Sequence, residues 1–116
     1  MSSSPAFLAA VLITNLPLPI QAHDIYSHLR DERGVRCCDD RDCHPAFYRF
    51  VGGDLQMFVD RQWIEVPRST IQYRALLGDT GETSGGHWCG IVYVPSIGAI
   101  YRTRCAILPP QAASAH

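Results

Sequence analysis

Three of the five cysteines lie within a stretch of seven residues that begins at Cys37 and is followed directly by His44. The other two, Cys89 and Cys105, lie far downstream. Clustered thiols can form disulfides, bind zinc as thiolates or exchange with other thiols. The chain has no Cys-x-x-Cys, and the downstream pair lacks the compact spacing of a zinc knuckle. The pattern therefore favours a structural disulfide scaffold.

One disulfide follows from the geometry of an expected hairpin. A hairpin centred on residue 97 places Cys89 opposite Cys105, and directly opposed Cα atoms lie about 4.5–5.5 Å apart. We therefore predict a Cys89–Cys105 bond. A second bond involves the upstream cluster, either as Cys38–Cys43 or by the cluster reaching across to the hairpin. Cys37 is then a free thiol or an alternative partner.

A metal site is the sharpest chemical hypothesis. If a signal peptide is cleaved before His23, the new α-amine and the imidazole can bind one ion. A second imidazole, from His44 or His87, completes a three-nitrogen site suited to copper(II). The plainer interpretation is that these histidines are surface or core residues. The aspartates after Cys38 lack the spacing of a calcium loop, and no other cofactor is expected.

Enzymatic activity has little support in the sequence. There is no Gly-x-Ser-x-Gly and no His-Glu-x-x-His. The candidate bases are His28, His44 and His87. A cleft that gathers His44 or His87 with a carboxylate would indicate a small periplasmic enzyme. We predict no catalytic residue.

Composition indicates the class of domain that must position the cysteines and histidines. The chain has 116 residues, 47% hydrophobic and 18% charged, which describes one globular domain. The net charge of −1 gives no general reason to bind nucleic acid. All ten basic residues are arginine.

Residues 1–22 have the composition of a secretory signal peptide, with an apolar run and a site for cleavage after Ala22. We therefore expect a periplasmic or secreted protein with no membrane span after cleavage. Small exported domains use disulfides because their cores are limited.

The mature chain begins with a predicted short helix over residues 25–33, capped by Asp24 and ended by Gly34. On one face of that helix, Arg30 and Arg33 could meet a carboxylate or a ligand anion, but a solvated charged face is the preferred interpretation. The pattern that follows predicts three short strands, over residues 47–51, 55–59 and 63–66, which together form a β-meander.

The second half is expected to contain one hairpin. Residues 67–77 are ambiguous, and Ser69 could cap a short helix there. Residues 78–86 form an exposed loop. Residues 88–94 and 100–108 are apolar, β-rich runs, with Val94 expected opposite Ile100. A disordered tail is expected over residues 111–116, so that the folded domain spans residues 23–110.

The order of these motifs resembles a family of small exported bacterial proteins of unknown function. The resemblance rests on Ala22-His23-x-x-Tyr26, Cys37-Cys38-x4-Cys43-x-Pro45, Trp63-x-x-Val66-Pro67, His87-Trp88-Cys89 and Arg104-Cys105-x-Ile107-Leu108-Pro109. It covers nearly the whole mature chain. It implies export and a disulfide scaffold, and it implies no activity.

Together these patterns predict an α+β domain. A short N-terminal helix packs on a small antiparallel sheet, made of a meander and a C-terminal hairpin, and disulfides staple the two. The expected function is that of an exported binding or structural module. A copper(II)-binding protein is the first alternative, and a small periplasmic enzyme is the second.

Overall fold

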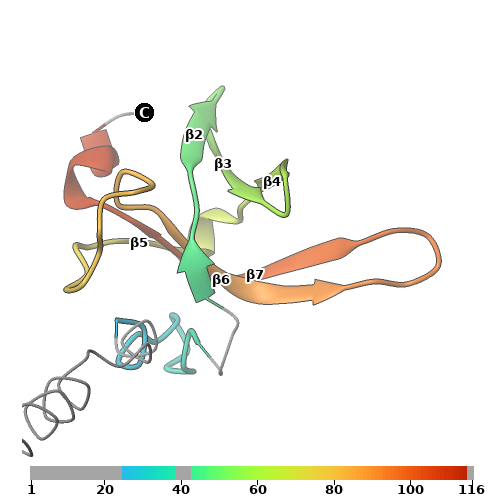
Figure 1. The fold of residues 1–116 in the computed structure, drawn as a ribbon, viewed down its shortest axis with the longest axis horizontal. Coiled ribbons are helices and arrows are strands. Elements are labelled where there is room, and N and C mark those ends of the chain that lie inside the picture. The colour runs from blue at the N-terminus through green and yellow to red at the C-terminus, as the bar shows by residue number, and fades with distance from the viewer. Residues whose placement is uncertain (1–24, 39–42, 115–116) are drawn as a thin grey trace, which may run out of the picture.

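The computed structural model describes residues 25–38 and 43–114. These residues form seven β-strands in two sheets, and their only helical turns are two short 3-10 helices (Figure 1). The predicted α+β class is therefore wrong, because the described fold is mostly β. The expected signal peptide and His23 lie outside the described residues. Within those residues, no helix is long and apolar enough to cross a membrane.

The predicted meander is confirmed as a three-stranded antiparallel sheet. It contains β2 (Tyr48–Val51), β3 (Asp54–Val59) and β4 (Gln62–Glu65), in that order. Alternate residues of β3 are buried, as expected for a strand with one face on a core. Asp60 and Arg61 both have positive φ, which is typical of two-residue hairpin turns that match the strand twist.

The predicted C-terminal hairpin is also confirmed, and it forms the centre of a second sheet. The strand order is β1 (Cys43–Pro45), β6 (His87–Tyr93), β7 (Ile100–Leu108) and β5 (Ile71–Tyr73). β1, β6 and β7 are antiparallel, whereas β5 runs parallel to β7. The apolar run of β7 is buried at its C-terminal end because it lies between two strands there.

The two faces of this second sheet cover two different cores. Trp88 and Leu108 belong to a core shared with the three-stranded sheet. Cys89 and Cys105 alternate with them and belong to the opposite core, where residues 25–38 pack. The N-terminal segment therefore covers the face of the sheet that carries these two cysteines.

The predicted register of the hairpin is correct near its base and wrong near its turn. Cys89 lies opposite Cys105, as expected. Closer to the turn, Tyr93 rather than Val94 lies opposite Ile100. The one-residue difference is absorbed by a β-bulge, a point where one strand carries an extra residue.

The bulge lies between Cys89 and Gly90, and Arg104 is the extra residue on the opposite strand. A Cβ atom at Gly90 would lie 2.4 Å from the carbonyl oxygen of Arg102 and 2.6 Å from the ring of Trp88. Only glycine permits this close approach of the strands. The bulge therefore depends on Gly90.

The predicted N-terminal helix is wrong. Asp31 accepts hydrogen bonds at its carboxylate from the backbone amides of Arg33 and Val35, at 2.9 and 2.8 Å. Its own amide donates to the carbonyl of Val35 at 2.7 Å, and Gly34 has a φ of 84°. An aspartate that binds nearby amides favours a turn over a helix. The chain therefore folds back on itself here.

The helix considered for residues 69–77 is also wrong. Only Arg68–Thr70 forms a 3-10 helix (η1), and β-branched Ile71 and aromatic Tyr73, both typical of strands, lie in β5. At the C-terminus, where a disordered tail was expected, Pro110–Ser114 forms a second 3-10 helix (η2). Ala112 of η2 is buried in the core shared by the two sheets.

The two disulfides differ from the predicted ones. Cys37 is bonded to Cys105, with Cα atoms 5.6 Å apart, and Cys43 is bonded to Cys89, with Cα atoms 4.0 Å apart. The expected Cys89–Cys105 and Cys38–Cys43 bonds are not formed. Cys38, and not Cys37, is outside both disulfides, and it is buried.

Competition for Cys89 explains this correction. Cys89 lies on a central strand and has a directly opposed cysteine on each side, Cys43 on β1 and Cys105 on β7. One sulfur forms one bond, and that of Cys89 is made with β1. Cys105 is then bonded by Cys37 from the segment that covers this face. The open alternative, in which the cluster reaches across to the hairpin, is the correct one.

Candidate functional site

A groove of about 660 Å³ lies between the N-terminal turn, β5 and the base of the β6–β7 hairpin. We call it the arginine groove, because four arginines line it. Two come from the N-terminal turn and two from β7. They are Arg30, Arg33, Arg102 and Arg104. This volume lies within the usual range for small-molecule sites.

The floor of the groove joins β5 to the N-terminal turn. The side-chain amide of Gln72 donates to the carbonyl oxygen of Arg30 at 2.7 Å and contacts the sulfur of Cys37 at 3.7 Å. The Cys37–Cys105 disulfide ties the same segment to β7. Both sides of the groove are therefore fixed to the four-stranded sheet.

The carboxylate of Asp31 is already engaged within the turn. The amide of Val35 donates to it, and this bond lowers its pKa, with further lowering from Arg33 and Arg104. The guanidinium of Arg33 lies 4.0 Å from it. Because Asp31 stabilises its own loop, its charge is directed at backbone amides as well as at the arginines.

The groove carries an excess of positive charge. Besides Asp31, Glu32 is the one other carboxylate in its lining, so two carboxylates face four guanidinium groups. Ser69 of η1 adds a hydroxyl group to the lining, whereas the hydroxyl of Thr70 already donates to the carbonyl of Pro67 at 2.7 Å. Arginine forks bind carboxylate and phosphate oxygens in pairs, and hydroxyl groups can complete such a set. The arrangement is suited to an anion.

The bulge places one of these arginines. Arg104 is the unmatched residue of β7, and Arg102 lies two residues further toward the hairpin turn, opposite Ile91. Bulges commonly redirect a side chain beside a binding site. The sequence offered only one signal for this, since glycine inside an apolar strand suggests a bulge. The groove itself was missed, although an anion had been considered for Arg30 and Arg33.

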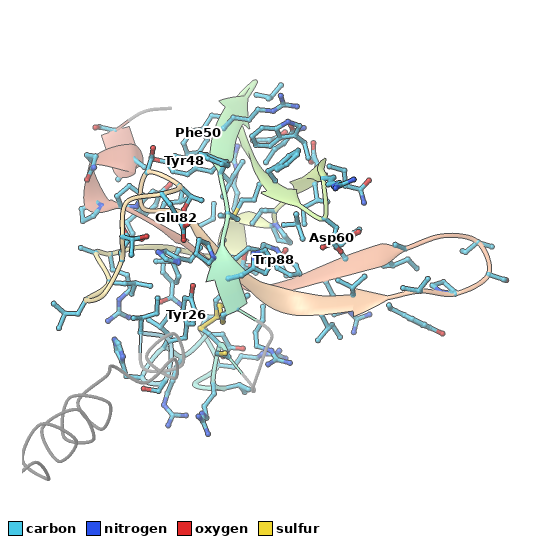
Figure 2. All side chains as sticks on the ribbon, viewed as in Figure 1. Tyr26, Tyr48, Phe50, Asp60, Glu82 and Trp88 are labelled. Atoms are coloured by element: carbon cyan, nitrogen blue, oxygen red, sulfur yellow. A yellow bond between two sulfur atoms is a disulfide. The ribbon has the colours of Figure 1, made fainter. Side chains whose placement is uncertain are left out.

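A second cluster of polar side chains lies inside the core that residues 25–38 cover. The ring nitrogen Nδ1 of His87 is 2.8 Å from the hydroxyl of Tyr26, and Nε2 is 2.7 Å from Oδ1 of Asp79. A carboxylate only accepts, so Nε2 carries a proton, and in the tautomer protonated at Nε2 alone, Nδ1 accepts from the tyrosine hydroxyl. Figure 2 shows Tyr26 between the N-terminal segment and the sheet.

Burial limits what this cluster can do chemically. His87 is 1% exposed, and the smaller groove of about 380 Å³ beside Asp79 is not lined by it. Desolvation raises the pKa of Tyr26 well above its usual range, with further raising by Cys38, Asp79 and Glu82. A tyrosine held neutral in a core is a poor nucleophile or base. The cluster joins a histidine to a carboxylate, but it has the character of a structural network.

Of the predicted metal ligands, the structure describes His44 and His87, which lie on opposite faces of the four-stranded sheet. His44 lies opposite Trp88 in the β1–β6 pair, and its ring is 5.7 Å from that of Trp88. His87 precedes Trp88 and therefore points to the other face of the sheet. Both ring nitrogens of His87 are hydrogen-bonded, so it is not placed to bind an ion. No group of three or more potential ligands occurs among the described residues, which do not include His23.

The imidazole of His44 makes one hydrogen bond through a ring nitrogen. Its Nδ1 donates to the carbonyl of Pro45 at 2.9 Å, which leaves Nε2 as the nitrogen with a lone pair. Any metal site built on His23 would therefore use His44 and not His87.

Comparison with known proteins finds no family model, no curated protein and no solved structure that matches this chain.

Proposed function

We propose that this chain is an exported, disulfide-stapled binding module and that its arginine groove binds a small anion bearing phosphate or carboxylate groups. The observation that carries the proposal is that four arginines from two distant segments line one groove. Export is supported by the character of residues 1–22 and by the two disulfides, since such bonds persist in oxidising compartments.

Charge balance supports an anionic ligand. Four like charges around one groove repel each other, and an anion between them would relieve that repulsion. Asp31 offsets only part of it, because its carboxylate also accepts backbone amides. A ligand with several charges, such as phosphate or a tricarboxylate, can contact arginines on both sides of the groove.

The way the groove is built also supports binding. Arg30 and Arg33 are held on a turn, and that turn is pinned by a disulfide and by Gln72. Groups that are already positioned lose less conformational entropy on binding than groups on a mobile chain. Hydrogen bonds to charged groups contribute roughly 1.5–3 kcal/mol each, so two or three of them are enough for measurable affinity.

Isothermal titration calorimetry at low salt tests the proposal. We expect inorganic phosphate and citrate to bind saturably to the oxidised protein, and acetate to bind more weakly. Arg102→Gln removes one guanidinium and should weaken phosphate binding by about tenfold, while added salt weakens it further.

Arg61→Gln is the matched control, because it removes the same charge from the exposed turn between β3 and β4. Its phosphate affinity should stay within about twofold of the wild type. If neither phosphate nor citrate binds, or if the two variants lose affinity equally, the groove is not an anion site. A purely structural module without a ligand would then be the better account.

A further inference from the structure

The outer part of the β6–β7 hairpin projects beyond both sheets (Figure 1). We call residues 91–101 the arm. β1 pairs only with residues 87–89 of β6, and β5 only with residues 106–108 of β7. Beyond these pairs the arm is a two-stranded ribbon, and such a ribbon on its own is marginally stable in water.

The arm exposes an unusual amount of apolar surface. It contains no charged residue from Ile91 to Tyr101. Six of its large apolar residues are exposed, and Ile97 at the tip is 87% exposed. The six are Ile91, Val92, Tyr93, Val94, Ile97 and Ile100. A contiguous exposed apolar surface marks an interaction site.

Both faces of the arm are apolar. Successive residues of a strand point to opposite faces, and Val92 and Tyr93 are both exposed. A flat partner surface would cover one face and leave the other in water. A medium that surrounds the ribbon, such as the outer part of a lipid bilayer, covers both.

Two features of the tip reduce the number of unpaired backbone groups that would enter a medium with few hydrogen bonds. Pro95 has no amide hydrogen, and its carbonyl accepts the amide of Gly98 at 3.1 Å. Unsatisfied backbone groups are costly in hydrocarbon. Tyr93, where β6 ends, is 57% exposed, and tyrosine is enriched where membrane and water meet.

The charged residues at the base of the arm indicate which kind of surface the arm contacts. Arg102 pairs with Ile91 at the base of the arm, and both line the arginine groove. From Arg102 to the tip the arm spans five residues, roughly 16 Å at the usual rise of a strand. Elements that lie in a membrane interface are buried by about 5–10 Å, so an inserted tip leaves Arg102 roughly 6–11 Å outside the inserted part. At that distance the charge of the groove still acts on the headgroup phosphates.

We propose that the arm inserts its tip into an anionic lipid surface, with the arginine groove facing the lipid headgroups. The proposed insertion of the tip depends only on the exposed apolar surface of the arm. The preference for anionic lipid rests on the proposed function of the groove, because the same arginines would contact the lipid phosphates.

Co-sedimentation with vesicles tests this. We expect the oxidised protein to bind vesicles that contain phosphatidylglycerol and to bind pure phosphatidylcholine vesicles less. Ile97→Asp should reduce vesicle binding by at least about tenfold. Leu77→Asp is the matched control, because Leu77 is 90% exposed on a loop outside the arm, and this variant should bind as the wild type does.

Phosphate titration separates the two proposals. Ile97→Asp should keep its phosphate affinity, whereas Arg102→Gln should lose phosphate affinity and the preference for phosphatidylglycerol together. Phosphate binding without binding to any vesicle would overturn the arm proposal and leave the groove proposal standing. Vesicle binding without phosphate binding would support the arm and overturn the groove.

A second copy of the chain is the competing occupant. If the protein is a dimer that Ile97→Asp converts to a monomer, and vesicles do not bind, the arm is a protein interface and the proposal is wrong. An Ile97→Trp variant gives a direct signal for the other outcome, since its fluorescence should shift to the blue on addition of anionic vesicles.

Discussion

Removal of the Cys37–Cys105 bond tests both the fold and the groove. In the chain-entropy account, a bond that joins residues 68 positions apart stabilises the fold by about 4.4 kcal/mol at 25 °C. Cys43–Cys89 lies inside that loop and shortens it to about 23 residues, which lowers the contribution to about 3.4 kcal/mol. The whole domain is expected to be stable by roughly 5–14 kcal/mol, so the loss is large.

The perturbation is the double variant Cys37→Ala/Cys105→Ala. It should lower the midpoint of urea unfolding by roughly 2 M. It should also weaken phosphate binding, because Arg30 and Arg33 lie on the segment that this bond holds. The control variant, Cys43→Ala/Cys89→Ala, also loses one disulfide but keeps that segment attached. It should be destabilised while retaining most of its phosphate affinity.

Tryptic mapping of the oxidised protein checks the pairing on which this reasoning depends. Cleavage after arginine places Cys43, Cys89 and Cys105 in three different peptides, and Cys37 in a fourth that it shares with Cys38. The cluster peptide should be linked to the Cys105 peptide. A peptide pair that links Cys89 to Cys105 would refute the reasoning, and so would a double variant as stable as the wild type.

Two further changes test the core network and the bulge. Tyr26→Phe leaves Nδ1 of His87 without its donor and should cost about 1–3 kcal/mol at neutral pH. The folded state raises the pKa of Tyr26, so its stabilising effect is complete below pH 10 and is lost as the pH rises above that value. Above pH 10 the free energy of unfolding of the wild type, measured with urea, should fall more steeply than that of the variant, by up to about 1.4 kcal/mol per pH unit. Parallel pH profiles for the two proteins would contradict this. Gly90→Ala should cost about 1–3 kcal/mol, because the methyl group would meet Trp88 and the backbone of Arg102. Ser96→Ala in the exposed turn serves as its control, and equal midpoints for the two variants would show that the bulge tolerates a side chain.

Five of the seven described strands could be predicted because their signals are local, whereas β1 and β5 were missed. Apolar residues alternate along β3, and short turns flank the meander. The β6–β7 hairpin is marked by two long apolar runs. The predicted opposition of Cys89 and Cys105 is correct only because the bulge offsets a one-residue error in the predicted register at the turn. Each of these features is set by residues close together in the chain.

The disulfides and the N-terminal turn could not be predicted because they depend on distant partners. The sequence does not show that β1 pairs with β6 and so brings a second cysteine beside Cys89. Asp31 can begin a turn or belong to a helix, and the turn is stabilised by packing of Leu29 and Tyr26 against the sheet. The parallel pairing of β5 with β7 is likewise a long-range contact.

The arginine groove was missed for the same reason. Arg30 and Arg33 were noted as a pair, but the two arginines of β7 are about 70 residues away in the chain and reach the groove only through a bulge. Conversely, His44 and His87 were considered interchangeable as metal ligands. Pairing of β1 with β6 places them on opposite faces of one sheet.

The most direct test of the central claim is an NMR titration that follows the Nε–Hε signals of the arginine side chains as inorganic phosphate is added. We predict that the signals of Arg30, Arg33, Arg102 and Arg104 shift together along one saturable curve, while that of Arg61 stays in place. Equal, non-saturating shifts at all arginines would show general charge screening, and would contradict an anion site in the groove.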